Sequence, residues 1–376
     1  MESRGESSKP RSVQPAAEEG APHRRNILVL GSRKSGKSSC IKTVFQQVPV
    51  KDVPFFGVTQ KVEKINYNSI VQLQVWDTPP NFDVDQLEGG LKSFSTLVYV
   101  IDMQQDDTYH EALYRFVTIM LKAYIANPGM KFAVFIHKAE MLSEDYRGEN
   151  YAEIQRTVQE DLEDFPYHTL QSLDPNTNFS DQSVTQAITN HLMGETRFEM
   201  TSIHDVSLRD AWSKVLQGCM EMLPAVESLL LNFTETSGMD NSYLFDIRSG
   251  VVLATDNRHR NDATLEQVTE YLSRFLQFRH LYKQLRQASE QTGNEPPTAD
   301  ADGEDLEWWD REDPSEQWMT QATKLSPNTT LSLWQFTPDV ALVVLLRTDT
   351  WQSRRGGIEY NLTFLRQGVR RIMQEV

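Results

Sequence analysis

The chain has 376 residues, of which 39% are hydrophobic and 10% aromatic, enough for two folded domains with packed cores. Its formal net charge of −16 argues against general nucleic-acid binding, which requires a basic face. Two cysteines, Cys40 and Cys219, cannot form a disulfide framework and suit a reducing cytoplasm. No apolar run reaches the ~20 residues of a membrane span, and the first residues do not resemble a signal peptide, so we expect no direct membrane insertion.

Strands alternate with helices in the first part of the chain. Residues 1–24 are rich in Ser, Pro, Glu and Arg and are expected to be disordered. The pattern then predicts strands at 27–30, twice within 65–76, and at 97–101, 132–136 and 198–201, and helices at about 38–46, 111–124, 151–162 and 208–223, the last ending near Pro224. The polar stretch 166–196 shows no period and is interpreted as an insertion. Residues 25–224 therefore predict an α/β domain with a mostly parallel sheet between helices.

A second pattern follows over residues 225–376. It predicts a hairpin of strands 243–247 and 251–255, a helix around 265–276, a second strand pair at 331–336 and 340–346, and a closing helix around 362–372. Residues 287–316 are acidic and contain Pro and Gly, which predicts a disordered insertion. Its tryptophan-bearing stretch 305–318 is either a docking motif or folds back onto this smaller α+β domain.

The segment GSRKSGKS (31–38) matches the pattern of a phosphate-binding loop, and it lies between a predicted strand and a predicted helix. A chance Gly/Ser/Lys turn is the alternative, which this setting disfavours. Glycines let the backbone N–H groups curl around phosphates, and the following helix adds the positive end of its dipole. Lys37 would reach the terminal phosphates, and the Ser38 hydroxyl would bind Mg²⁺. The residues expected to contact the phosphates are Gly31, Ser32, Arg33, Lys34, Ser35, Gly36, Lys37, Ser38 and Ser39.

A magnesium ion at this loop needs further oxygen ligands. Asp77 comes at the end of a predicted strand, where it can hold the ion or its waters. Thr59, in FFGVTQ (55–60), could supply a second hydroxyl, although a solvated turn residue is almost as good an interpretation. The expected metal ligands are therefore Ser38, Thr59 and Asp77.

Two later loops have the composition of a purine-binding site. FIHKAE (135–140) ends a buried strand, so the stem of Lys138 can lie over a base while Glu140 accepts hydrogen bonds from guanine N1–H and N2–H₂. The alternative is that His137 and Lys138 merely end the strand. In MTSIHD (200–205), a backbone N–H of Ser202 or Ile203 could contact the base oxygen.

These loops occur in the order and spacing of a Ras-like GTPase. GSRKSGKSS (31–39), VYVIDMQ (98–104), FIHKAEMLSED (135–145) and TSIHD (201–205) resemble a Rag GTPase of the C/D type, in which His137 in place of the usual asparagine is characteristic. YLFDIRSGVVLATD (243–256) is similar to the start of the roadblock-type C-terminal domain of that family. The resemblance covers residues 26–376 apart from the two insertions.

The resemblance implies a GTP- and GDP-binding protein that uses Mg²⁺. It also implies a heterodimer with a Rag A/B-type GTPase through the C-terminal domains. Such a pair would lie at the lysosome or vacuole membrane through a scaffold complex, otherwise cytoplasmic, and would report amino-acid status to the target-of-rapamycin kinase complex. In this family the C/D-type subunit signals in its GDP form, and a GTPase-activating regulator is expected.

Three positions depart from an ordinary switch protein. Pro80 replaces a glycine whose N–H contacts the γ-phosphate, and proline has no N–H. Asn81 replaces the water-positioning glutamine, so the expected catalytic pair is Lys37 and a shorter Asn81. Glu140 replaces the usual aspartate. Two hypotheses follow: a slow or partner-dependent GTPase with GDP bias, or a nucleotide-stabilised scaffold subunit that never cycles. A metabolic P-loop kinase is a distant third, because no substrate-binding Arg cluster is evident.

Overall fold

The structure is a computed structural model that describes residues 25–69, 72–87, 89–104, 109–258, 262–292, 320–326, 328–337 and 339–374. The predictions of disorder for residues 1–24 and 293–316 concern residues outside these ranges. The docking segment 305–318 also lies outside them. Within the described residues, no helix is both long enough and apolar enough to cross a membrane.

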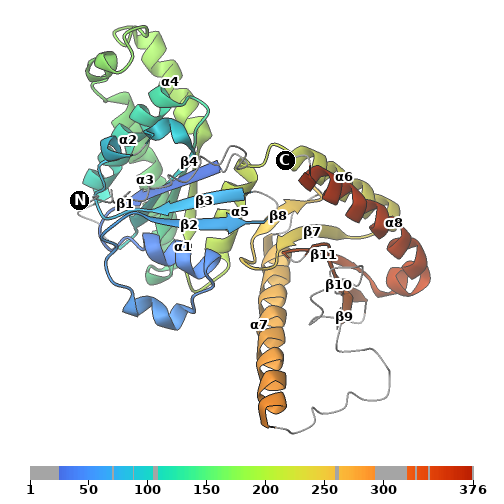
Figure 1. The fold of residues 1–376 in the computed structure, drawn as a ribbon. Helices are drawn as coiled ribbons and strands as arrows, with labels where there is room; N and C mark the ends of the chain where they lie inside the picture. Colours follow the sequence, from blue (N-terminus) through green and yellow to red (C-terminus); the bar gives the residue numbers. More distant parts are fainter. Residues whose placement is uncertain are drawn as a thin grey trace, which may run out of the picture.

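The first sheet has six strands in the order β2-β3-β1-β4-β5-β6 (Figure 1). Its strands are β1 (Arg25–Gly31), β2 (Glu63–Asn68), β3 (Gln72–Asp77), β4 (Phe94–Asp102), β5 (Lys131–His137) and β6 (Thr196–Thr201). All neighbouring pairs are parallel except β2 and β3, which are antiparallel. The predicted mostly parallel sheet is confirmed.

Helices cover both faces of this sheet because its central strands are apolar on both sides. The helices are α1 (Lys37–Phe45), α2 (Tyr109–Ala126), α3 (Glu144–Glu163), α4 (Gln182–Glu195) and α5 (Ser207–Gly218). In β1, Ile27 and Val29 belong to the core beneath α1 and α5, whereas Leu28 and Leu30 belong to the core beneath α2, α3 and α4. The first part of the chain is thus a three-layer α/β unit.

The second sheet is antiparallel, with strand order β8-β7-β11-β10-β9. Its strands are β7 (Asn241–Asp246), β8 (Val252–Thr255), β9 (Thr320–Ser326), β10 (Thr329–Gln335) and β11 (Val340–Arg347). Helices α6 (Leu223–Ser237) and α8 (Thr348–Gln374) lie side by side over one face, and α7 (Asp262–Thr292) covers the other (Figure 1). The predicted smaller α+β unit is confirmed, and β9 is an additional strand.

Two local predictions were wrong. The helix predicted over 208–223 ends at Gly218, and Pro224 lies in the first turn of α6, where its missing N–H leaves no intrahelical bond unmade. Residues 287–292, predicted to be disordered, continue α7. The polar stretch 166–196, interpreted as an insertion, contains the helix α4, which was not predicted and whose buried side chains include Ile188 and Leu192.

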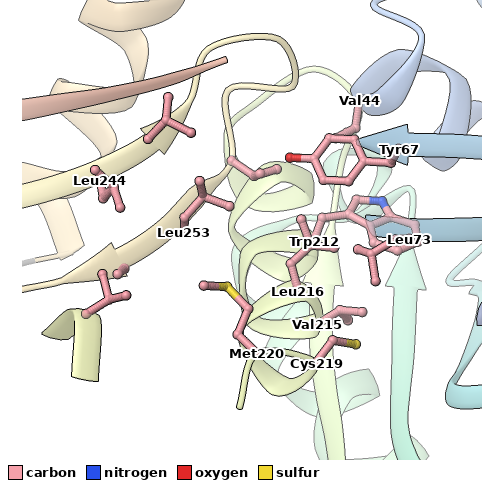
Figure 2. Close-up of a cluster of buried hydrophobic side chains, with 14 of the residues drawn as sticks. Val44, Tyr67, Leu73, Trp212, Val215, Leu216, Cys219, Met220, Leu244 and Leu253 are labelled. Atoms are coloured by element: carbon pink, nitrogen blue, oxygen red, sulfur yellow. The ribbon is translucent and has the colours of Figure 1, made fainter. Parts of the chain in front are cut away.

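The two sheets share one continuous apolar core. Figure 2 shows Trp212, Leu216 and Met220 of the α5 region lying between the first sheet and Leu244 and Leu253 of the second. Polar contacts reinforce the same junction: the Ser213 hydroxyl accepts from the Val252 N–H at 2.8 Å. The second unit is therefore packed directly against the helix layer that carries α1 and α5.

Candidate functional site

The candidate site lies where strands of the first sheet end. The loops that follow β1, β3, β5 and β6 leave the carboxyl edge of this parallel sheet, the usual place for a ligand in an α/β fold. Residues 31–38, 77–81, 137–140 and 201–205 are thereby brought to one edge although they are far apart in the sequence.

The loop after β1 needs glycine at both ends. Gly31 has φ +146°, and a Cβ there would lie 2.3 Å from the carbonyl oxygen of Val100. Gly36 has φ +97°, and a Cβ there would lie 2.4 Å from Cδ2 of His137. The loop therefore packs directly on β4 and on the His137 ring. Helix α1 begins at Lys37. The N–H groups of its first turn, which have no partner within the helix, therefore face the curved loop that precedes it.

Lys37 lies inside this loop. Its side chain is almost fully buried, and Nζ donates to the carbonyl oxygens of Gly31 at 2.9 Å and Ser32 at 2.8 Å. Burial lowers the pKa of Lys37 to about 8, and the charge of Asp77 opposes that change. The ammonium remains mostly charged at neutral pH, so it adds positive charge at the centre of an anion-binding loop.

Ser38, Thr59 and Asp77 lie together beside Lys37. The Ser38 hydroxyl donates to Asp77 Oδ2 at 2.5 Å and is 2.8 Å from the Thr59 hydroxyl, which is itself 3.3 Å from Asp77 Oδ2. The other carboxylate oxygen, Oδ1, is buried and has no hydrogen-bond partner among the described residues. Burial raises the pKa of Asp77. Two hydroxyls and a carboxylate with a spare buried oxygen form a hard oxygen donor set, which fits Mg²⁺.

A transition-metal centre is not supported. In the part of the chain that the structure describes, no group of three or more His, Cys, Asp and Glu side chains is placed to hold a metal ion. An ion at the Ser38 cluster would therefore be held mainly by hydroxyl, carboxylate and water oxygens, which is the preference of Mg²⁺.

His137 joins the phosphate loop to the loop after β6. It is 2% exposed, and its Nδ1 is 3.0 Å from the Thr201 hydroxyl. Burial lowers the pKa of His137 to about 4, and the nearby Glu140 carboxylate opposes this only in part. The ring is therefore neutral at pH 7, and it packs against Gly36 as an uncharged support.

Lys138 and Glu140 are held differently from each other. The Lys138 backbone is left-handed, with φ +63°, and its ammonium pairs with the Asp102 carboxylate at the end of β4. In Glu140, Oε2 is buried and lacks a partner within the described ranges, while Oε1 lies 3.8 Å from His204 Nε2. A buried carboxylate oxygen without a partner favours a ligand that donates to it.

The loop after β6 is folded by its own side chains. The Ser202 N–H donates to the Ser207 hydroxyl at 2.9 Å, and the His204 N–H donates to the Ser202 hydroxyl at 3.0 Å. Ile203 lies between these two bonded amides and is half-buried. Its N–H is therefore the amide of this loop that best fits the predicted contact to a base oxygen.

Asn81 lines a cleft of about 660 Å³, together with Ser32 and Arg33 of the phosphate loop. Its side chain is exposed, and its φ of +54° is left-handed. Asparagine adopts this conformation more readily than most residues. The residue is thus close to the loop that would hold phosphates, but no hydrogen bond fixes its amide in the structure.

Sequence reasoning missed three residues around the site. Arg115 of α2 donates to the Phe82 carbonyl oxygen, Tyr99 of β4 lies near enough to Ser32 for that side chain to oppose the rise of its pKa, and Asp102 pairs with Lys138. Asp102 ends an apolar strand, which is a weak signal of an edge position. Arg115 and Tyr99 lie within apolar stretches that indicated packing alone.

Comparison with known proteins gives consistent results. The Gtr1/RagA G protein conserved region matches residues 26–276. The chain is 31% identical to the Ras-related GTP-binding protein C of Mus musculus and to that of Homo sapiens; each alignment covers 93% of this chain, and 77% and 76% of the relatives respectively. It is 27% identical to the GTP-binding protein gtr2 of Schizosaccharomyces pombe, over 93% of this chain and 98% of that protein.

Proposed function

Because this chain belongs to the Gtr1/RagA family of G proteins and is of its Rag C/D type, we propose that the four loops described above form its guanine-nucleotide site. The observation that carries this proposal is the arrangement of Lys37 within the phosphate loop next to the Ser38, Thr59 and Asp77 oxygens. A buried cation beside a hard oxygen cluster at a helix N-terminus suits a phosphate chain with its magnesium ion.

Each group has a defined role in this proposal. The loop amides of residues 31–39 and Lys37 bind the phosphates, and Ser38, Thr59 and Asp77 hold Mg²⁺ directly or through water. When bound, Mg²⁺ would neutralise part of the phosphate charge. The direct hydrogen bonds among the three side chains hold their oxygens close together before an ion binds. This preorganisation reduces the entropy cost of binding the ion.

Guanine selection falls to Glu140 and Lys138. The unpaired buried oxygen of Glu140 can accept from guanine N1–H and N2–H₂, a donor pair that adenine lacks on this edge. Because Asp102 holds the Lys138 ammonium, the aliphatic stem of that lysine is left to cover a purine ring. The Ile203 N–H is the proposed donor to the base oxygen, and neutral His137 supports the phosphate loop.

GTP hydrolysis is proposed to be slow or partner-dependent. Pro80 offers no N–H to a γ-phosphate, and Asn81, the proposed partner of Lys37 in catalysis, is exposed and unanchored. The left-handed backbone at position 81 suits asparagine better than glutamine, so asparagine at this position is favoured by the backbone conformation and not only by catalysis. GDP needs neither position, which supports a GDP bias.

The second candidate function is a nucleotide-stabilised scaffold subunit that never cycles. The same two residues favour it, because a segment without a γ-phosphate donor cannot report the terminal phosphate by that contact. Lys37, Ser38 and Asp77 remain compatible with both functions. Single-turnover hydrolysis separates the two candidates.

The cellular role is inferred from family membership. We propose a GTPase domain over 25–224 and a roadblock-type domain over 225–376 that pairs with a Rag A/B-type GTPase. The pair would relay amino-acid sufficiency to the target-of-rapamycin kinase complex. It would reside in the cytoplasm, held peripherally on the lysosome or vacuole by a scaffold complex, and a GTPase-activating regulator would act on it.

The proposal is tested on the chain co-purified with a Rag A/B-type partner whose own nucleotide site is disabled. GDP and GTP affinities are measured with Mg²⁺ and with a chelator, followed by single-turnover hydrolysis. GDP binding that is tighter than GTP binding and strengthened by Mg²⁺, with slow turnover, supports a GDP-biased GTPase. Binding without any turnover supports the scaffold function. If neither nucleotide binds in either condition, the guanine-nucleotide site proposed here is wrong.

A further inference from the structure

The segment that follows β3 is tied to α2 rather than left free. The Arg115 Nη2 donates to the carbonyl oxygen of Phe82 at 2.7 Å, and Lys122 Nζ is 2.8 Å from the Asp85 carboxylate. Both basic residues come from the same face of α2, and both contacts fall on residues 81–87, which contain the short helix η2 (Val84–Gln86). We call residues 81–87 the post-Asp77 segment.

Arg115 is the stronger of the two ties. The Lys122–Asp85 pair is open to solvent, with side-chain exposures of 30% and 66%, and exposed ion pairs contribute little. Arg115 is half-buried, and a charged donor on a backbone carbonyl gives a short, strong hydrogen bond. The bond is also made to the residue directly after Asn81.

Arg115 lines a cleft that reaches the phosphate loop. The 660 Å³ cleft is lined by residues of the post-Asp77 segment, by residues of α2 and by Ser32 and Arg33. The guanidinium is close enough to the nucleotide side of the cleft for its charge to add to the effect of burial, which lowers the pKa of Lys37, and to oppose in part the burial that raises the pKa of Tyr99. The Arg115–Phe82 hydrogen bond, which we call the clamp, therefore lies next to the place where a terminal phosphate would be bound.

Pro80 removes the backbone donor by which a nucleotide could hold this segment. A segment that the nucleotide does not hold must be fixed by the protein, or it remains loose in every state. The Arg115–Phe82 bond supplies such a fixed point within two residues of Pro80.

We propose that Arg115 is a positioning residue that holds the post-Asp77 segment against α2 in the GDP and GTP forms alike. The segment then presents one conformation to a partner and does not report the terminal phosphate. The nucleotide part of this inference rests on the proposed function; the clamp itself rests on the contacts to α2.

Amide hydrogen exchange tests the clamp on the full chain. The reporters are the amides of η2 and its end, because Asp85 N–H donates to Asp83 Oδ1, Gln86 N–H to Asp83 O and Leu87 N–H to Val84 O. Exchange of these amides is compared with GDP and with a non-hydrolysable GTP analogue. In the wild type we expect the same protection in both complexes. In Arg115→Gln we expect exchange to rise by about tenfold or more in both, as when a hydrogen bond to a charged group is lost.

A double variant distinguishes the clamp from a general loss of stability, because its expected effect depends on which nucleotide is bound. In Arg115→Gln with Pro80→Gly, position 80 regains an N–H, so protection of the segment should become nucleotide-dependent and return only with the GTP analogue. Arg366→Gln is the matched control, because Arg366 makes the same kind of bond, Nη2 to the Gln335 carbonyl at 3.2 Å, in the second sheet. It should leave the segment unchanged.

The outcomes separate the two proposals. Unchanged protection in Arg115→Gln, or protection in the wild type that differs severalfold between GDP and the GTP analogue, overturns the clamp. Failure of both nucleotides to bind refutes the proposed function, yet loss of protection in the ligand-free Arg115→Gln chain still supports the clamp. An equal loss in Arg366→Gln assigns the effect to global destabilisation and overturns the specific role of Arg115.

Discussion

The Ser38 hydroxyl and the Asp77 carboxylate are hydrogen-bonded at 2.5 Å, although the two residues lie on different elements. The strand β3 and the first turn of α1 thus place two oxygen ligands at one point before any ion binds. Residues that are preorganised in this way should contribute to magnesium binding together rather than singly.

Ser38→Ala should remove the magnesium-dependent part of nucleotide affinity. Loss of an oxygen contact to a charged group is worth about 1.5–3 kcal/mol, so we expect GDP affinity in Mg²⁺ to fall roughly 10- to 100-fold. The measurement is GDP dissociation in Mg²⁺ and in excess chelator. Wild type and variant should become similar in the chelator. An equal loss in both conditions would show that Ser38 acts on the phosphate or the fold and not through the ion.

Gly36→Ala should abolish nucleotide binding. The new Cβ would lie 2.4 Å from the His137 ring on a backbone with φ +97°, so either the loop or the buried ring must move. Gly57→Ala is the matched control, because nothing lies within 4 Å of a Cβ there. GDP titration of both variants tests the prediction. Normal GDP binding by Gly36→Ala would contradict the packing of the loop on His137.

Much of the fold could be predicted because its signals are local. The apolar runs of β4 and β5 indicate strands buried on both faces, and the strands β7 and β8 flank a short run of turn residues, as in a hairpin. The region around Pro224 was misjudged because proline ends one helix and begins another with the same sequence signature. Helix α4 was missed because its mostly polar exposed face hides the few side chains it buries.

The candidate site was predictable where its residues are contiguous. The phosphate loop is one continuous segment, so the residues that would bind the phosphates can be predicted from a single motif. Arg115, Tyr99 and Asp102 reach the site only because β4 and α2 pass beside the loops, and neither element has a motif. Such contacts depend on tertiary packing. The residue types can be read from the sequence, but which residues they contact cannot.

His137 should make the protein less stable in mild acid. In the unfolded chain its imidazole binds a proton below about pH 6.5, whereas burial lowers the folded pKa to about 4. Between these values the unfolded state binds more protons, so the free energy of unfolding falls as pH falls. The contribution of this residue is about 2 kcal/mol between pH 7 and pH 5.

Denaturant unfolding at pH 7 and pH 5 measures this effect. His137→Asn can keep a hydrogen bond to Thr201 but carries no titrating group. Between pH 7 and pH 5 its free energy of unfolding should therefore fall by about 2 kcal/mol less than that of the wild type. All other titrating residues are common to both proteins and cancel in the comparison. The prediction would be wrong if the two proteins lost the same free energy of unfolding.

The shared core predicts that the two sheets unfold together. Leu253 of β8 is 2% exposed and lies in the same apolar cluster as Trp212 and Leu216 (Figure 2). Leu253→Ala should lower the free energy of unfolding by about 2–5 kcal/mol. Calorimetry of the wild type should show one transition, and GDP should raise the midpoint of the whole transition. Two transitions, only one of them responding to GDP, would contradict this coupling.

Restoring an N–H at position 80 should restore discrimination in favour of GTP. A hydrogen bond to a charged group contributes about 1.5–3 kcal/mol, so Pro80→Gly should raise GTP affinity by about tenfold or more. GDP affinity should not change, because GDP lacks the phosphate that this N–H would contact. The measurement is competition between GTP and GDP for one purified preparation.

Pro80→Ala separates the donor from backbone freedom. Alanine supplies the same N–H as glycine with less conformational entropy in the unfolded and unbound chain. If the donor is what matters, both variants should gain GTP affinity to a similar extent. A gain with glycine alone would mean that the segment must move to reach the phosphate, and that the Arg115 bond to Phe82 opposes this movement. No gain in either variant would show that the lost N–H is not the reason for a GDP preference.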